Sequence, residues 1–335
     1  MISAIYSDRS FKVVDNGVTS SARAQQSGIS QGCPLSPFLF VIVMSVVMRE
    51  AAAEMSSDHQ QRLADGRLGE LLYADDTLLL SVSSASLSSF MASISACGNK
   101  HGLELHWGKL QLMKVRCGEN VRKPDGSIVE ATDEMVYLGA SICNDGRLGR
   151  ELSRRLGFAT REFNNLLRVW KHCRLSQKRK IEIFNSLVVS KLTYGLVTSW
   201  LSTAERRRVD GFQNRCLRIT MNITPAYVSR VSNKDVLTQA QQTPVSARVL
   251  EQQLLLFGKV SRLPDGNPMR DATFCPGSLR SSCDRYVRRV GRPRLEWASE
   301  LYKHAIADTG SEVKMRELMR DAKTWRQYVC AYVYR

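Results

Sequence analysis

The alternation of hydrophobic and polar residues over the first quarter of the chain predicts two β-hairpins. Residues 9–14 and 18–24 flank Asn16-Gly17, and Asn-Gly is the strongest two-residue signal for a hairpin. Two short apolar runs, residues 68–73 and 77–82, flank an Ala-Asp-Asp sequence. They predict a second hairpin with acidic residues at its tip.

Longer apolar segments predict helices beside these hairpins. The prolines at 34 and 37 open an apolar segment that we expect to be helical to about Met55, because proline suits the first turn of a helix. Ser83 and Ser84 are candidate N-caps of a second helix that ends near Gly102. Two further short strands are expected, around residues 111–116 and 135–138.

After Gly146 the spacing of apolar residues becomes helical through about Thr220. Another helix is expected over residues 250–263, then a loop-rich stretch, then two helices from Pro293. The fold class is therefore predicted to be α+β. We expect three parts: a mixed part over residues 1–145, a helical part over 146–222 and a second, basic helical part over 223–335.

The charge of the chain points to a polyanionic partner. Its formal net charge is +16, and basic proteins of this kind usually meet nucleic acid first and an anionic membrane second. Residues 147–180 hold eleven Lys and Arg against two Glu. We expect Arg154, Arg155, Lys178 and Arg179 to bind nucleic acid; a solvated basic surface without a partner is the alternative.

The cysteines indicate a reducing compartment. There are nine, an odd number without a C-x-x-C pair, which argues against a disulfide framework and for an intracellular protein of the cytoplasm or nucleus. Cys275, Cys283 and His304 fit no common zinc-finger spacing, so free thiols are favoured. We expect no signal peptide. The longest apolar run, residues 38–48, is shorter than the ~18 residues of a membrane span, so we expect no membrane partner.

Asp75 and Asp76 raise a question, because adjacent charges in an apolar run are costly to remove from water. At the tip of a hairpin that cost is smaller, and the flanking strands fix the tip. A fixed carboxylate pair suits Mg²⁺, which takes oxygen ligands and shares them with substrate phosphates. An ordinary surface turn is the alternative, since Asp is common in turns.

Neighbouring segments favour the metal site, because together they resemble a known family. YADD, residues 73–76, resembles the palm hairpin of reverse transcriptases, and GISQGCPLSPFLF, residues 28–40, resembles the loop and helix before it. Later segments are similar to the palm, thumb and carboxy-terminal regions of polymerases from non-LTR (LINE-type) retrotransposons: HGLELHWGKLQLMKV (101–115), VYLGA (136–140), LTYGLVTSW (192–200) and GRPRLEW (291–297).

The resemblance implies a partial polymerase palm followed by a helical thumb and a helical carboxy-terminal region. The implied activity is RNA-directed DNA synthesis by two-metal nucleotidyl transfer, with an RNA template, a DNA primer, dNTPs and two Mg²⁺ ions. Asp75 and Asp76 would be catalytic metal ligands. Lys109 would act on the departing pyrophosphate; Leu110 follows it where the family usually has Thr or Ser, and a solvated lysine is the alternative.

The resemblance also implies contacts with the nucleic acid and the incoming nucleotide. Gln31 and Gly32 would approach the template base and nucleotide, and Tyr73 would lie against the primer end. Three residues of the next hairpin would hold the primer strand: Tyr137, Leu138 and Gly139. A purely structural role is the alternative for three of these residues. Tyr73 and Leu138 could be core residues, and Gln31 could form hydrogen bonds within its loop.

The chain departs from the family in two further respects. The family site has a third carboxylate on an earlier strand, and fingers that hold the triphosphate. Only Asp8 and Asp15 are available before the QGCPLSP loop, and neither has the expected setting. We therefore favour a carboxy-terminal piece that is inactive alone. The alternatives are a non-catalytic nucleic-acid-binding remnant and a subunit that borrows the strand from a complementing polymerase chain.

Overall fold

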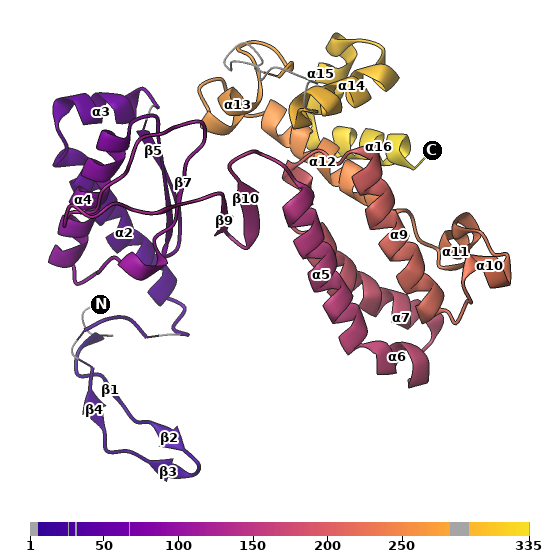
Figure 1. Ribbon diagram of the computed structural model, residues 1–335, viewed down its shortest axis with the longest axis horizontal. Coiled ribbons are helices and arrows are strands. Elements are labelled where there is room, and N and C mark those ends of the chain that lie inside the picture. Colours follow the sequence, from indigo (N-terminus) through magenta and orange to yellow (C-terminus); the bar gives the residue numbers. More distant parts are fainter. Residues whose placement is uncertain (1–5, 26, 31, 67, 282–294, 335) are drawn as a thin grey trace. The chain divides into compact units, whose positions relative to one another are not determined.

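The computed structural model describes residues 6–25, 27–30, 32–66, 68–281 and 295–334. The chain forms two compact units, Met1–Leu138 and Gly139–Arg335. The first combines short strands with helices, and the second is almost entirely helical (Figure 1). The α+β fold class is confirmed. The division falls at Leu138, and residues 139–335 form one compact unit. The predicted three-part division stays a prediction.

The first hairpin has the predicted Asn-Gly turn. Asn16 and Gly17 both have positive φ, 47° and 80°, as a two-residue turn of type I′ requires. The two antiparallel strand pairs on either side of this turn are β2 (Val14–Asp15) with β3 (Val18–Thr19), and β1 (Ser10–Phe11) with β4 (Arg23–Ala24).

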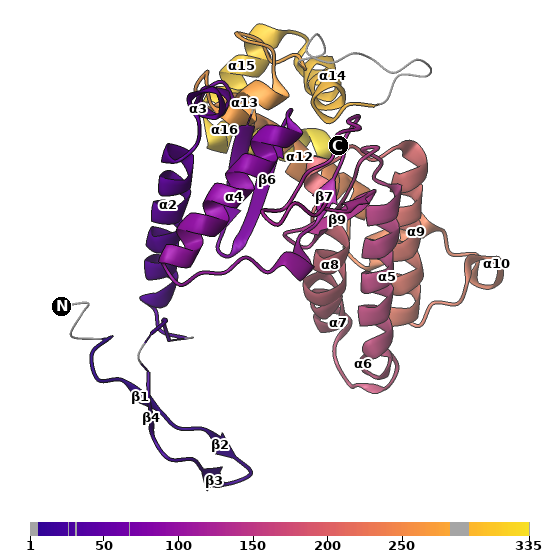
Figure 2. The ribbon, with the colours of Figure 1, turned by 60° about the vertical axis from the view of Figure 1, so that its left-hand side comes forward.

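The core of the first unit lies between two helices and the second hairpin. β5 (Leu68–Tyr73) and β6 (Asp76–Ser81) pair in antiparallel register, and α2 (Ser36–Ala53) and α4 (Ser84–Lys100) run side by side next to them (Figure 2). The hairpin and both helices are confirmed. A short helix that the sequence did not predict, α3 (Ser57–Ala64), connects α2 to β5. The buried side chains shared by these elements are Val47, Met48, Ala51, Met55, Leu68, Phe90, Ile94 and Cys97.

Both ends of α4 follow from its sequence. The Ser83 hydroxyl accepts a hydrogen bond from the Ser86 amide at 3.3 Å, which caps the amino end. At the other end Gly102 adopts φ 72°, and the Leu103 amide donates to the Gly98 carbonyl at 2.9 Å. This glycine turn sends the chain back along the helix.

The remaining strands are short. After a 3₁₀ turn, η1 (Trp107–Lys109), the strand β7 (Leu112–Met113) pairs with β8 (Ala131–Thr132). Their pairing is parallel, unlike that of the two strands of each hairpin. β9 (Glu134–Tyr137) and β10 (Ala140–Cys143) form a third hairpin. Within the described ranges each sheet has two strands.

The second unit contains two hydrophobic cores that share one long helix. α12 (Val245–Ser261) contributes Val245 and Val249 to the first core, and Leu254 and Phe257 to the second. The first core is enclosed by α5 (Gly149–Asn165), α6 (Leu167–His172), α7 (Gln177–Ile183), the π-helix η2 (Phe184–Val189), α8 (Ser190–Thr193), η3 (Leu196–Thr198), α9 (Thr203–Thr220) and α11 (Asn233–Gln239). A four-residue helix, α10 (Ala226–Ser229), precedes α11.

The second core is enclosed by short carboxy-terminal helices. In the part of the chain that the structure describes there are three helices after Pro293, where the sequence predicted two. Gly310 (φ 73°) ends the first, and the side chains of Ser311 and Asp321 cap the next two. The elements are α13 (Pro268–Thr273), α14 (Trp297–Thr309), α15 (Glu312–Arg320) and α16 (Ala322–Val333).

α2 is long and apolar enough to cross a membrane if judged by length and composition only. The apolar run predicted from the sequence ended near Met48, so it underestimated the length of this apolar helix. A single such helix is weak evidence, because a core helix passes the same test. Val47, Met48 and Ala51 are buried in the core of the first unit, whereas Phe38, Val41 and Ile42 in the amino-terminal half of the helix are exposed.

Candidate functional site

The acidic pair lies at the tip of the β5–β6 hairpin. Tyr73 and Asp76 form the last cross-strand pair, so Ala74 and Asp75 make the two-residue turn. Ala74 has a positive φ of 52°, whereas φ of Asp75 is negative. This combination of signs is that of a type II′ turn. A two-residue turn fixes the register of the two strands. The hairpin therefore fixes the backbone positions of Asp75 and Asp76.

The two faces of this hairpin have different environments. Leu68 is buried against α2 and α4, and Leu79 packs against the same core. Tyr73 points to the opposite face and is 64% exposed. The alternative of Tyr73 as a core residue is therefore excluded by its placement.

Asp75 and Asp76 are both exposed. Among the described residues neither forms an ion pair, and no three acidic, His or Cys side chains are grouped closely enough to hold a metal ion. Neither Asp8 nor Asp15 therefore completes the pair. Two hydrated carboxylates fit one Mg²⁺ ion that keeps several waters and binds substrate phosphates. They do not supply the third, bridging carboxylate of the family site.

Sequence reasoning missed a third acid on the hairpin. Glu70 lies on β5 in register with Leu79, on the face toward the helices. Burial raises the pKa of its carboxyl group, and its buried Oε2 has no hydrogen-bond partner in the described part of the chain. Because the register places it on the face opposite Tyr73, Glu70 is not part of the acidic tip. The only sequence signal was an acid at a core-facing strand position.

The loop before α2 is organised by an arginine that the sequence did not single out. The Arg9 guanidinium donates to Ser30 Oγ at 2.6 Å and to the Gly28 carbonyl at 3.0 Å, and it lies over the Tyr6 ring at 3.9 Å. Gly32 has φ 87° and is exposed, with no atom within 4 Å of where a Cβ would stand. Glycine is needed there for conformation. Gln31 lies outside the described residues.

Lys109 lies at the end of η1 and is exposed. Its ammonium group makes no ion pair or hydrogen bond in the ranges that the structure describes, so nothing there joins it to Asp75 or Asp76. In this structure Lys109 is a solvated lysine, and its role toward pyrophosphate stays a prediction.

The third hairpin turns at Leu138 and Gly139, which have φ 47° and 72°. As at the first hairpin, two positive φ values make a type I′ turn. Leu138 and Tyr137 are partly exposed. The Gly139 carbonyl accepts hydrogen bonds from the guanidinium groups of Arg154, at 2.7 Å, and of Arg155. Residues from α5 therefore hold the β10 side of this turn.

Arg154 and Arg155 are also bound to a buried acid. Glu151 accepts from Arg155 Nε at 2.5 Å and from Arg154 Nε at 2.8 Å, and from the Ser141 amide at 3.0 Å. Burial alone would raise the pKa of Glu151, but these hydrogen bonds outweigh it and lower the pKa. Arg155 is 7% exposed and lies over the Tyr194 ring. The charge of Arg155 is therefore paired and buried in this structure. Binding of nucleic acid by Arg154 and Arg155 stays a prediction.

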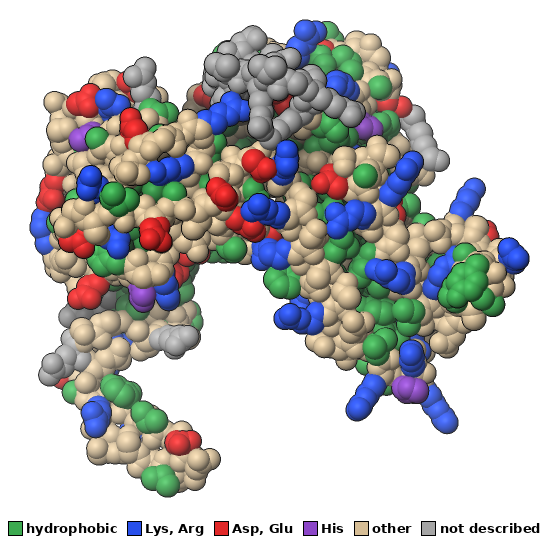
Figure 3. Space-filling view, viewed as in Figure 1, with side chains coloured by type: hydrophobic (Ala, Val, Ile, Leu, Met, Phe, Trp, Pro, Cys, Tyr) green, Lys and Arg blue, Asp and Glu red, His purple; other side chains and the backbone are tan. Residues whose placement is uncertain are grey.

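Most other basic side chains of this region are open to solvent. Lys178 and Arg179 are exposed, and Arg179 pairs with Glu182 at 2.9 Å. Lys180 is buried, and its ammonium donates to the Trp170 carbonyl at 2.6 Å. Lys and Arg side chains protrude at the end of the bundle that carries α6 (Figure 3). The exposed basic residues between 147 and 180 are Arg147, Arg150, Arg161, Arg168, Lys171, Arg174, Lys178 and Arg179.

Of the three residues considered for a zinc site, the structure describes Cys275 and His304. Cys283 lies outside the described residues. His304 Nδ1 is hydrogen-bonded to the Tyr332 hydroxyl at 2.8 Å, and its ring lies 5.3 Å from that of Trp200. Within the described ranges the eight cysteines form no disulfide.

Comparison with known proteins relates the chain to one class of polymerase. Residues 1–142 match the family model for reverse transcriptase (RNA-dependent DNA polymerase), and this segment contains the Asp75–Asp76 hairpin. A transposon-derived protein of Caenorhabditis elegans is 26% identical over 277 residues, which are 79% of this chain and 96% of that protein.

A second relative belongs to a retrotransposable element. The Pol polyprotein of the type-1 retrotransposable element R2 from Popillia japonica is 25% identical over 301 residues, or 83% of this chain. The match covers 39% of that polyprotein. The chain is thus similar to reverse transcriptases of retrotransposons, and it spans less than half of the R2 polyprotein.

Proposed function

We propose that the β5–β6 hairpin is the metal-binding part of an RNA-directed DNA polymerase site of non-LTR type. The observation that carries this proposal is the exposed Asp75–Asp76 pair, at a fixed two-residue turn, inside the segment that matches the reverse transcriptase family. Mg²⁺ bound there would stabilise negative charge on phosphate oxygens during nucleotidyl transfer.

Other residues would position the substrates. The exposed Tyr73 phenol stands beside Asp76 on one face of the hairpin, where a primer end could contact both. The Gly32 backbone is open on its Cβ side, so a nucleotide could approach it closely. The β9–β10 turn, braced at Gly139, would contact the primer strand, and Lys109 would meet the pyrophosphate. The substrates are an RNA template, a DNA primer and dNTPs.

We further propose that these 335 residues do not synthesise DNA by themselves. Two carboxylates only partly balance two Mg²⁺ ions beside a triphosphate, and no third acid joins them in the described part of the chain. A strand that carries the third carboxylate, supplied in cis or by a complementing polymerase chain, would be required.

Primer extension on a primed RNA template with Mg²⁺ and dNTPs tests this proposal. We expect no product from the 335 residues. A chimera that adds fingers and the first palm strand of a family member should extend the primer, and Asp75→Ala should abolish that extension. A matched control, Asp58→Ala on α3, removes an exposed acid outside the hairpin and should leave it intact. Extension by the unmodified chain would refute the need for a third carboxylate.

A nucleic-acid-binding remnant without catalysis is the second candidate. The exposed basic residues of α5–α7 favour it, since they can contact phosphates whether or not the acidic pair binds metal. A well-folded chimera that binds primer–template but stays inactive would support this candidate over the first. For either function we propose a reducing compartment, the cytoplasm or the nucleus, because the cysteines of the described ranges form no disulfide.

A further inference from the structure

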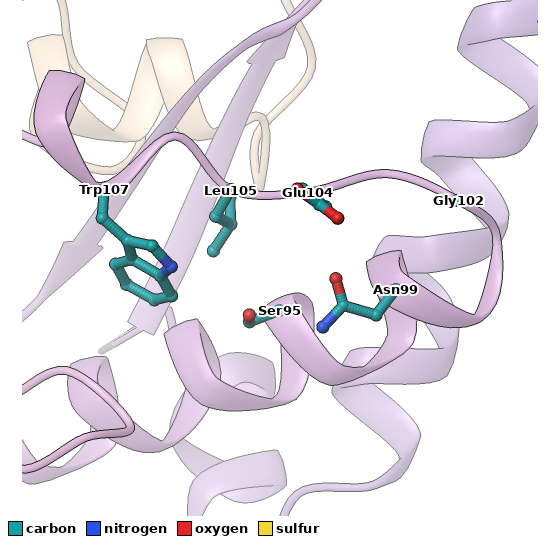
Figure 4. Close-up of a pocket in the computed structure, with 6 residues that line it drawn as sticks. All are labelled: Ser95, Asn99, Gly102, Glu104, Leu105 and Trp107. Carbon is teal, nitrogen blue, oxygen red and sulfur yellow. The ribbon is translucent and has the colours of Figure 1, made fainter.

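We propose that a pocket on the first unit binds an unpaired guanine base. The pocket has a volume of about 340 Å³ and lies between the end of α4 and the segment that returns along it. Figure 4 shows the side chains that surround it. The lining residues are Ser95, Asn99, Gly102, Glu104, Leu105 and Trp107. This inference does not depend on DNA synthesis by the chain.

The pocket is built by the turn at the end of α4. Gly102 reverses the chain with φ 72°, and Leu103 then enters the core of the first unit. Glu104 and Leu105 follow on the returning segment, opposite the helix. Trp107 closes one end of the pocket, and its ring packs on the small cluster of Met91, Val121 and Val129. The walls therefore belong to one compact unit with a defined conformation.

Four polar groups of the pocket are available to a ligand. In Figure 4 the Ser95 hydroxyl, the Asn99 amide and the Trp107 indole nitrogen border the same space as the Glu104 carboxylate. Within the residues that the structure describes, none of these four side chains makes a hydrogen bond or ion pair. Their partners must come from water or from a bound molecule.

The set of groups matches guanine better than other ligands from nucleic acid. Glu104 places a negative charge in the pocket, which disfavours a phosphate. A carboxylate accepts two parallel hydrogen bonds, and guanine alone among the common bases presents adjacent N1–H and amino donors. Asn99 can donate a hydrogen bond to the O6 carbonyl, an acceptor that identifies guanine in the major groove of DNA. The indole of Trp107 offers a stacking surface, which single-stranded nucleic acids use commonly.

The pocket is large enough for one base. Ligand pockets usually span ~300–1,000 Å³, and about 340 Å³ is at the small end of that range. The base could belong to a single-stranded RNA or DNA, or to a free guanine nucleotide. The two sources share the same edge chemistry, and competition with GMP distinguishes them.

The test uses the whole chain and short single-stranded RNAs of about eight uridines in which one central residue is guanosine, inosine or adenosine. Fluorescence anisotropy at one salt concentration measures their affinities. Inosine keeps N1–H but lacks the amino group. We expect guanosine to bind about tenfold more tightly than inosine or adenosine, because a bidentate contact discriminates by about that factor or more.

Two variants make the result specific to the pocket. Glu104→Gln should remove the preference for guanosine, whereas Glu130→Gln, which deletes one exposed acid elsewhere on the same unit, should keep it. Asn99→Asp should weaken the guanosine RNA by placing a second negative charge against O6. Competition by GMP indicates a free-nucleotide site, and its absence indicates an unpaired guanine within a strand. Equal affinities for the three RNAs, or a preference that survives Glu104→Gln, would overturn the proposal.

Discussion

Tyr73 and Asp76 are partners in the last cross-strand pair of the β5–β6 hairpin, so the phenol and the carboxylate stand on one face. The same alternation places Leu71 and Leu80 on that face, where they are 50% and 51% exposed. Each strand of this hairpin has a single neighbour among the described residues. The face that carries the acidic tip is therefore apolar, open and bounded by unpaired strand edges.

This open face predicts self-association. Exposed apolar strands with free edges pair readily with other chains. We expect Leu71→Thr combined with Leu80→Thr to reduce light scattering on concentration of the protein, with little change in Tm, because threonine keeps a high β-propensity. Leu79→Thr on the core face is the control: it should lower stability by about 2 kcal/mol without reducing association. Scattering that is unchanged in the double variant would argue against this face.

The ion-pair cluster around Glu151 predicts that the substitution Glu151→Gln strongly lowers the stability of the protein. Glu151→Gln leaves Arg155 buried without its charged partner, and removing one member of a buried pair costs about 3 kcal/mol or more. Chemical denaturation at neutral pH measures the loss. The matched control is Glu182→Gln, which breaks the exposed pair with Arg179; it should cost less than about 1 kcal/mol. Equal losses would mean that the buried cluster contributes no more than a surface pair.

The same cluster predicts sensitivity to acid. The pKa of Glu151 is lowered in the folded protein, so its contribution to stability is complete above the unfolded pKa of about 4.3. That contribution is lost as the pH falls through the lower, folded value. Glu151→Gln cannot titrate there, and its stability should change less steeply than that of the unmodified chain between about pH 5 and pH 3. Parallel stability–pH curves would contradict this.

Local features of the sequence were enough to predict the acidic hairpin and its surroundings. The Ala-Asp-Asp turn between apolar runs, the Asn-Gly turn and the Ser83 cap act over a few residues, and the structure contains all three. The role of Arg155 was missed because its partners include the Gly139 carbonyl and the Tyr194 ring, which only the fold brings together. A local signal did exist: Glu151 and Arg155 have the i, i+4 spacing of a helical ion pair.

The exposed basic residues of α5–α7 predict salt-dependent binding of nucleic acid. Neutralised phosphates release counterions, so affinity should fall steeply between ~50 and ~200 mM salt. Removing four exposed charges that form no ion pair with another described residue should flatten the log–log slope by up to ~0.9 for each phosphate that is no longer neutralised. The four substitutions, to alanine, are at Arg168, Lys171, Arg174 and Lys178.

A control with the same change in net charge separates direct binding of phosphates from bulk charge. Four exposed basic residues of the carboxy-terminal helices can be replaced together by alanine: Lys314, Arg320, Lys323 and Arg326. If the α5–α7 residues bind phosphates, their removal should flatten the slope more than the control does. Equal slopes in the two variants would show that those residues act only through net charge. Arg154 and Arg155 are left unchanged, because their replacement would disturb the Glu151 cluster.

Two helical glycines predict opposite outcomes for the same substitution. Gly157 is exposed on α5 with open space around it, so Gly157→Ala should stabilise the protein by about 0.5–1 kcal/mol. A Cβ on Gly258 would collide with the Trp325 ring, which is 1% exposed and donates to the Leu254 carbonyl at 2.8 Å. Gly258→Ala should therefore destabilise by about 1–3 kcal/mol. Urea denaturation measures both changes.

A double-mutant cycle then assigns the cost of Gly258→Ala to that collision. Trp325→Leu removes the ring atoms that the new methyl group would meet, at the cost of a cavity in the second core. In this background Gly258→Ala should cost less than in the unmodified chain, since the methyl group partly fills the cavity, and the coupling should exceed about 0.5 kcal/mol. An equal cost in both backgrounds would mean that the glycine is needed for something other than close approach of α12 to Trp325.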